Sequence, residues 1–179
     1  MRAFASRGAA VISSDEIVHS LLRDDGKVKA AIVKRLGRGV LDERGEIDRA
    51  RVAEIVFGDR DALDWLEGLL HPRVVASYLD WRERLAELPD APEVCVTEVP
   101  LLYEVGAEER FDVVVAVTAS PAVRASRVVK PMADRERRLL PDSEKLARAD
   151  FSYVNDGSLE ELDAFVSDVM AKLRECSDR

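Results

Sequence analysis

The stretch "GAAVISSDEIVHSLL", residues 8–22, decides the fold class of this chain. Residues 9–13 form a short apolar run typical of a strand, and residues 15–22 follow with the spacing of a helix. Two further apolar runs, 94–99 and 113–118, are rich in valine and predict parallel strands covered on both faces. Strands that alternate with helices in this way indicate an α/β doubly wound domain.

A mostly helical segment, about residues 26–91, separates the first strand from the second. Asp48 can cap one of its helices, because its carboxylate can accept hydrogen bonds from the free N–H groups of the first turn. Leucines at helical spacing continue as far as Pro72, which disfavours helix in the residue before it. We therefore expect one helix to end at Pro72 and another to occupy about residues 74–88.

Two start signals mark helices in the second half of the chain. Ser120 and Pro121 combine a cap with a residue favoured in the first turn. Ser158 and Glu161 match the capping box, in which each side chain bonds the backbone N–H of the other residue. The helix that follows is expected to bury one apolar face, made of Leu159, Leu162, Phe165, Val166, Val169, Met170 and Leu173.

The composition excludes several classes of protein. The chain has 27 basic and 35 acidic residues and a formal net charge of −8, which argues against non-specific nucleic-acid binding. No apolar run approaches the roughly 20 residues that span a bilayer, so no membrane partner is expected. Cys95 and Cys176 have no metal-binding spacing. We expect both to be reduced thiols of a cytoplasmic protein, with no metal bound by protein side chains.

Three separated segments agree with one known family. In order along the chain they are "GRGVLDERGEIDRARVAEIVFGDRDALDWLEGLLHPRV" (37–74), "EVPLLYEVGAEERFDVVVAV" (98–117) and "LPDSEKLARADFSYVNDGS" (140–158). Together they resemble the dephospho-CoA kinases. The resemblance implies a P-loop NTPase-like, three-layer parallel sheet in a single kinase-like domain over residues 1–179. Its parts would be a core (1–25 and 92–179), a helical acceptor-binding insert (about 26–91) and a short lid (about 127–145).

The function implied by the resemblance is ATP-dependent phosphorylation of the 3′-hydroxyl of dephospho-CoA, the last step of coenzyme A synthesis. ATP and dephospho-CoA would be the small-molecule substrates. Two alternatives stay open on the sequence alone. One is a non-catalytic remnant or binding protein of the same fold, and the other is a different P-loop kinase of small molecules. Oligomeric state cannot be predicted.

The resemblance further implies a strand and a G-x-x-x-x-G-K-[ST] phosphate loop ahead of residue 8. No such pattern occurs in the 179 residues, so we expect the first central strand and the P-loop to be missing from this chain. That loop cradles phosphates with its N–H groups, and its Ser or Thr holds Mg²⁺. ATP and Mg²⁺ are therefore the expected cofactors, and both are expected to need the missing loop.

Asp15 and Arg135 are the catalytic candidates. Asp15 aligns with the general base of the family and would accept the proton of the attacking hydroxyl; otherwise it is an acidic residue stabilised by the helix dipole. Arg135 aligns with the lid arginine and would clamp the transferred phosphate, as would Arg127 at the edge of the lid. The alternative for both arginines is a solvated, charged helix surface.

The acceptor pocket is expected around a helix end and a strand end. His71 is expected to end its helix with a structural hydrogen bond and not to act in catalysis, and the resemblance implies that it would shape the pocket. Pro100, Leu101 and Leu102 would line the pocket at the carboxyl edge of the sheet, where α/β folds bind ligands, and Glu104 would bond ligand or backbone. The alternative is an ordinary strand-to-helix corner.

The remaining candidates are a turn and two side chains that we assign elsewhere. Asn155, Asp156 and Gly157 would contact the nucleotide base through backbone groups, or would simply lead into the helix that follows. His19 is expected to pack or face solvent, and Lys145 to be structural or on the surface.

Overall fold

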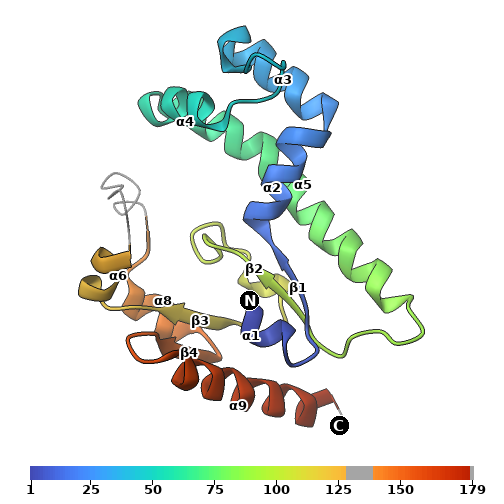
Figure 1. Ribbon diagram of the computed structural model, residues 1–179, viewed down its shortest axis with the longest axis vertical. Helices are drawn as coiled ribbons and strands as arrows, with labels where there is room; N and C mark the ends of the chain where they lie inside the picture. The colour runs from blue at the N-terminus through green and yellow to red at the C-terminus, as the bar shows by residue number, and fades with distance from the viewer. Residues whose placement is uncertain (128–138, 178–179) are drawn as a thin grey trace. The chain divides into compact units, whose positions relative to one another are not determined.

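The computed structural model describes residues 1–127 and 139–177 and divides into two compact units. The helical unit is Ala10–Glu98. The C-terminal unit combines Met1–Ala9 with Val99–Arg179. Figure 1 shows the elements of both, and each unit is described by itself below.

The helical unit contains a parallel pair of strands and four helices. In chain order its elements are β1 (Ala10–Ser13), α2 (Ser14–Asp24), α3 (Gly26–Leu36), the 3₁₀ turn η1 (Arg38–Val40), α4 (Arg49–Gly58), α5 (Arg60–Ala86) and β2 (Cys95–Glu98). β1 and β2 pair in parallel, with Ala10 opposite Cys95 and Ser13 opposite Glu98. The predicted strands at the two ends of the helical segment are therefore confirmed, and so is their parallel direction.

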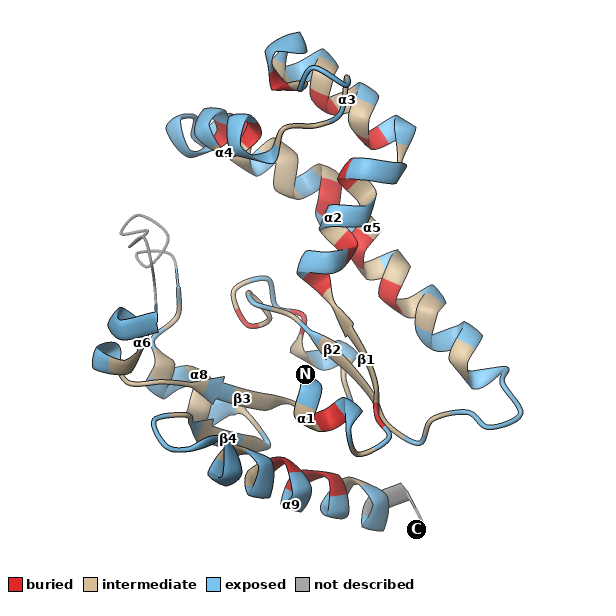
Figure 2. Ribbon diagram, in the orientation of Figure 1, coloured by how far each residue is buried: buried red, intermediate tan, exposed pale blue. Residues whose placement is uncertain are grey.

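The core of the helical unit lies among α2, α3, α4 and α5. Val28, Ile32 and Val40 have 0% of their surface exposed, and buried side chains of α2, α4 and α5 surround them. Figure 2 shows short buried segments, in red, on α2, α3, α4 and α5. Removing these apolar side chains from water stabilises the packing of the four helices.

An aspartate caps the N-terminus of three of these helices. Asp25 accepts hydrogen bonds from the first N–H groups of α3, and Asp59 caps α5. The Asp48 side chain accepts from the backbone N–H groups of Ala50 and Arg51, which confirms the predicted cap of α4. Each carboxylate satisfies donors that a helix leaves free at its start.

The predicted helix break at Pro72 is wrong, because α5 continues through it. A proline inside a helix lacks one N–H donor and costs about 3 kcal/mol relative to alanine. Leu70 and Val74 are buried on either side of the proline, and the Arg73 guanidinium donates to the Leu69 carbonyl at 2.6 Å. The helical bond that Pro72 cannot make is the one to the Gly68 carbonyl, so we infer that burial of the neighbouring side chains offsets the cost of the proline.

The C-terminal unit has a second parallel pair of strands. Its elements are α1 (Arg2–Ala5), the 3₁₀ turn η2 (Glu108–Arg110), β3 (Val115–Thr118), α6 (Pro121–Arg127), α8 (Asp142–Arg148), β4 (Phe151–Val154) and α9 (Leu159–Ser177). β3 and β4 pair in parallel, with Val115 opposite Phe151. The two parallel pairs and the helices between them confirm an α/β fold.

Helix α9 starts as predicted. The Ser158 N–H donates to Glu161 Oε2 at 2.8 Å, and the Glu161 N–H donates to Ser158 Oγ at 3.2 Å, so the capping box is confirmed. Val166 and Met170 are buried on the predicted face. Leu159 is 79% exposed, so its assignment to that face is wrong. The start of α9, at Leu159, thus lies outside the buried apolar face of the helix.

The strands are less covered than predicted. No residue of the four strands is fully buried, and Val117 in β3 is 51% exposed. Each sheet of the described chain has only two strands, so every strand is an edge strand with one unpaired side. The prediction that both faces are covered therefore does not hold for Val117.

Candidate active site

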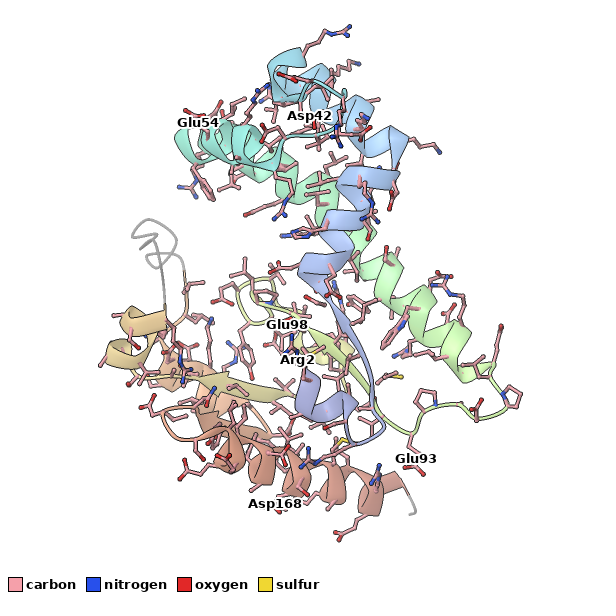
Figure 3. The ribbon with its side chains drawn as sticks, viewed as in Figure 1. Arg2, Asp42, Glu54, Glu93, Glu98 and Asp168 are labelled. Atoms are coloured by element: carbon pink, nitrogen blue, oxygen red, sulfur yellow. The ribbon has the colours of Figure 1, made fainter. Side chains whose placement is uncertain are left out.

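Asp15 lies at the carboxyl end of a strand, as its sequence context predicts. It stands in the first turn of α2, directly after β1, and its side chain is exposed. The strand that pairs with β1 is β2, and it ends in Glu98, which is opposite Ser13 in register and is also exposed. Figure 3 labels Glu98 at the end of β2. The carboxyl edge of this sheet thus carries two carboxylates within one unit, and sequence reasoning missed Glu98.

His71 lies inside α5 and not at a helix end, because the helix continues to Ala86. Its side chain is exposed, and among the described residues its ring makes no hydrogen bond. The structural hydrogen bond expected for His71 is therefore not formed within the described part of the chain. Its role in an acceptor pocket stays a prediction.

The segment that follows β2 forms a compact turn. Pro100 is exposed, whereas Leu101 and Leu102 are half-buried. The carbonyl of Leu101 accepts from the Val105 N–H at 3.1 Å, and that of Leu102 accepts from the Ala107 N–H at 2.9 Å. These backbone bonds close a turn that contains two of the predicted pocket residues, Leu101 and Leu102.

Glu104 is the best-anchored of the predicted site residues. Its Oε1 lies 2.6 Å from Lys145 Nζ and accepts from the Leu140 N–H at 3.0 Å. The Glu104 and Lys145 side chains are only 13% and 20% exposed. Oε2 of Glu104 is buried and has no hydrogen-bond partner among the described residues. One oxygen of the carboxylate thus ties the turn to α8, and the other is left for a further partner.

The electrostatics of Glu104 follow from these contacts. Burial by itself would raise the pKa of the Glu104 carboxyl, because it penalises the charged form. The hydrogen bonds from Lys145 and from the backbone N–H groups of Glu104 itself and of Leu140 outweigh burial, and the pKa of the Glu104 carboxyl lies below its ordinary value. Glu104 is therefore a carboxylate at neutral pH.

Tyr103 joins the same junction between the turn and α8. The Arg148 guanidinium lies over the Tyr103 ring, 4.4 Å from its centroid, and also pairs with Glu108. A cation over an aromatic face is attracted by the ring quadrupole. Two ion pairs and this ring contact therefore connect the segment after β2 to α8.

The turn after β4 is tied to the end of β3. The Asn155 N–H donates to the Thr118 carbonyl at 2.7 Å, and Asp156 Oδ1 accepts from the Ser120 N–H at 2.7 Å. Gly157 follows where an added Cβ would collide with the Glu161 carboxylate. Asn155 and Asp156 are thus hydrogen-bonded to the end of β3, and Gly157 follows them in the same turn.

The two lid arginines differ in what the structure records. Arg127 is the last residue of α6 and is exposed. Arg135 lies outside the described residues.

Near α6, Asp142 at the start of α8 accepts from the Thr118 hydroxyl at 2.8 Å and pairs with Arg124 at 2.9 Å. Sequence reasoning missed this contact, since nothing in the local pattern joins residues of two separate helices.

The comparisons with known proteins agree with one another. A family model described as dephospho-CoA kinase matches residues 1–161. A dephospho-CoA kinase from Protochlamydia amoebophila is 32% identical over 174 residues, covering 93% of this chain and 85% of that protein. One from Leifsonia xyli is 35% identical over 178 residues, covering 95% and 89%. The chain belongs to the dephospho-CoA kinase family.

Solved structures support the same assignment. The dephospho-CoA kinase from Campylobacter jejuni matches with a TM-score of 0.70 and 25% identity, over 98% of this chain and 90% of that one. A crystal structure from Thermus thermophilus matches with a TM-score of 0.72 and 30% identity, over 96% and 88%. The α/β fold of this family member is therefore that of solved relatives.

Two features are absent from the part of the chain that the structure describes. Within residues 1–127 and 139–177 no three histidine, cysteine or carboxylate side chains come together to hold a metal ion. Over the same residues no helix is both long and apolar enough to cross a bilayer.

Proposed function

We propose that this chain transfers the γ-phosphate of ATP to the 3′-hydroxyl of dephospho-CoA. The observation that carries the proposal is the family match over residues 1–161, together with relatives of that name at 32–35% identity over most of their length. The proposal includes a P-loop NTPase-like arrangement of the whole sheet, with the helical insert binding the acceptor. It also includes a cytoplasmic location, which the free thiol of Cys95 supports.

Asp15 is the proposed general base. The 3′-oxygen forms a bond to the γ-phosphorus while the bond from that phosphorus to the bridging oxygen breaks, and ADP leaves. The hydroxyl proton passes to the Asp15 carboxylate. The exposure of Asp15 at the carboxyl end of β1 supports this role, because a base must reach its substrate.

The C-terminal unit offers the proposed nucleotide contacts. The turn formed by Asn155, Asp156 and Gly157 would hold the base, and Arg127 and Arg135 would contact phosphates. Pro100, Leu101, Leu102 and Glu104 would line the part of the acceptor pocket that belongs to this unit, and His71 is a separate pocket candidate within the helical unit. The hydrogen-bonded backbone of the turn after β2 and the free Oε2 of Glu104 support this assignment.

Mg²⁺ belongs to the proposal as an ion that arrives with ATP. Mg²⁺ commonly binds through one or two carboxylates plus substrate phosphates and keeps several waters. When bound, it would neutralise charge on the β- and γ-phosphates.

The test is a kinase assay with product identification. The chain is incubated with Mg·ATP and dephospho-CoA, and mass spectrometry of the product locates one added phosphoryl group at the 3′-position. The assay is repeated on the chain extended by the in-frame codons upstream of Met1, because G-x-x-x-x-G-K-[ST] does not occur in these 179 residues. Binding of dephospho-CoA without turnover in both forms would favour the binding-protein alternative.

Asp15→Asn tests the assigned base. In the form of the chain that turns over dephospho-CoA, we expect kcat to fall by roughly 10²–10⁴-fold, because a positioned base contributes about that much, while the Kd for dephospho-CoA changes little. Glu16→Gln is the matched control: it removes the neighbouring exposed carboxylate of the same turn and should leave kcat unchanged. An equal loss in both variants would contradict the role of Asp15.

A further inference from the structure

Arg49 and His19 meet on the surface of the helical unit. Arg49 is the first residue of α4, and its Nη1 lies 3.5 Å from Nδ1 of His19 on α2. Both side chains are exposed. The cap formed by Asp48 fixes the first turn of α4 and hence the backbone from which Arg49 extends. Two separate helices thus bring a guanidinium beside an imidazole.

The charge of Arg49 is not neutralised by the described protein. No carboxylate among residues 1–127 and 139–177 lies within ion-pair distance of its guanidinium. Arg51, two residues further on, differs: it pairs with Asp48 at 3.1 Å and donates to the Leu41 carbonyl at 2.7 Å. Arg51 therefore has a structural task, whereas the fork of Arg49 is available to a planar or tetrahedral anion.

The position of Arg49 relates it to the proposed base. Asp15 and His19 are four residues apart on α2, so they lie on the same face, about 6 Å apart along the helix axis. His19 in turn contacts Arg49. The helical unit therefore presents the Asp15 carboxylate and, about one helical turn along α2, His19 with the unneutralised Arg49 guanidinium beside it.

We propose that Arg49, with His19 beside it, binds the diphosphate of dephospho-CoA. The inference rests on the proposed function and adds the group of the acceptor that the helical unit recognises. The 3′-hydroxyl and the 5′-diphosphate of dephospho-CoA are attached to the same ribose. A base that contacts the hydroxyl and a cation that binds the diphosphate must therefore be separated by no more than the length of one nucleoside. In a chain of net charge −8, a polyanionic acceptor needs such a local cation to bind.

The test compares two ligands that differ by the diphosphate. Ligand-observed NMR titration of the full chain measures Kd for dephospho-CoA and for adenosine, in wild type and in Arg49→Gln. We expect the substitution to raise the Kd for dephospho-CoA roughly ten- to hundredfold, as for loss of a charged hydrogen bond. The Kd for adenosine should rise less than about twofold. Arg49→Lys keeps the charge without the fork and should recover part of the affinity.

Arg60→Gln is the matched control, because Arg60 is an 81% exposed arginine at the start of α5. It should change neither Kd. Equal weakening of both ligands in Arg49→Gln, no weakening, or no binding of dephospho-CoA by the wild type would each overturn the assignment. The readout is binding and not turnover. A diphosphate-dependent loss in a chain without kinase activity would thus support Arg49 while rejecting the proposed reaction.

Discussion

The helices of the helical unit and the strands of both units differ in how fully their side chains leave water. Ile32 in α3 is completely buried, whereas Val117 in β3 is about half exposed. A helix forms its backbone hydrogen bonds internally and needs neighbours only for its side chains. A strand needs neighbours for its backbone as well as for both faces. In the described chain, side chains are therefore more fully buried on these helices, which form their own backbone hydrogen bonds, than on the strands.

Ile32→Ala tests this difference at its strongest point. We expect the free energy of unfolding to fall by about 2–5 kcal/mol, because the substitution removes buried methyl groups and leaves a cavity. Val117→Ala should cost less than about 1 kcal/mol, since half of that side chain is already in water. Urea denaturation followed by circular dichroism measures both. Equal losses would mean that exposure does not distinguish the two regions.

Local signals in the sequence predicted local features of the fold. The cap at Asp48 and the box of Ser158 and Glu161 were predictable because cap and helix are within four residues of one another. The break predicted at Pro72 failed for the opposite reason. Its cost is local, but the burial of neighbouring residues in α5 that offsets it depends on distant helices.

The candidate site shows the same limit. The positions of Asp15 and Asn155 at strand ends followed from the order of strand and helix along the chain. The pairing of Glu104 with Lys145 joins residues 41 apart, and the contact of His19 with Arg49 joins residues 30 apart. No periodicity encodes such pairs, so only the fold reveals them.

Two ion pairs allow the contribution of a mostly buried pair to stability to be compared with that of an exposed pair. Glu104 and Lys145 are 13% and 20% exposed, whereas Arg23 and Asp24 are 69% and 59% exposed. Lys145→Met leaves the Glu104 carboxylate mostly buried without its cation and should cost about 1–3 kcal/mol in the free energy of unfolding. Arg23→Met should cause no measurable loss, because water already solvates that pair. Chemical denaturation distinguishes the two, and a larger loss for Arg23→Met would contradict the argument.

The smallest expected effect is on the pH dependence of stability. The pKa of Glu104 lies below its ordinary value of 4.5 in the folded protein, since the bonds from Lys145 and from the backbone N–H groups of Glu104 itself and of Leu140 outweigh burial. The unfolded chain then binds more protons than the folded one near this pH. The stabilisation is therefore present above the unfolded pKa and is lost as pH falls through the lower, folded pKa.

Glu104→Gln has no such group to titrate, so its free energy of unfolding should fall less than that of the wild type when pH is lowered from 6 through this region. Glu16→Gln, which removes an exposed carboxylate, should keep the wild-type slope. Urea titrations at closely spaced pH values measure the slopes. A Glu104→Gln slope equal to that of the wild type would mean that Lys145 and Leu140 do not stabilise the charged form of Glu104. The contrast between its buried ion pair and the exposed pairs would then have no electrostatic basis.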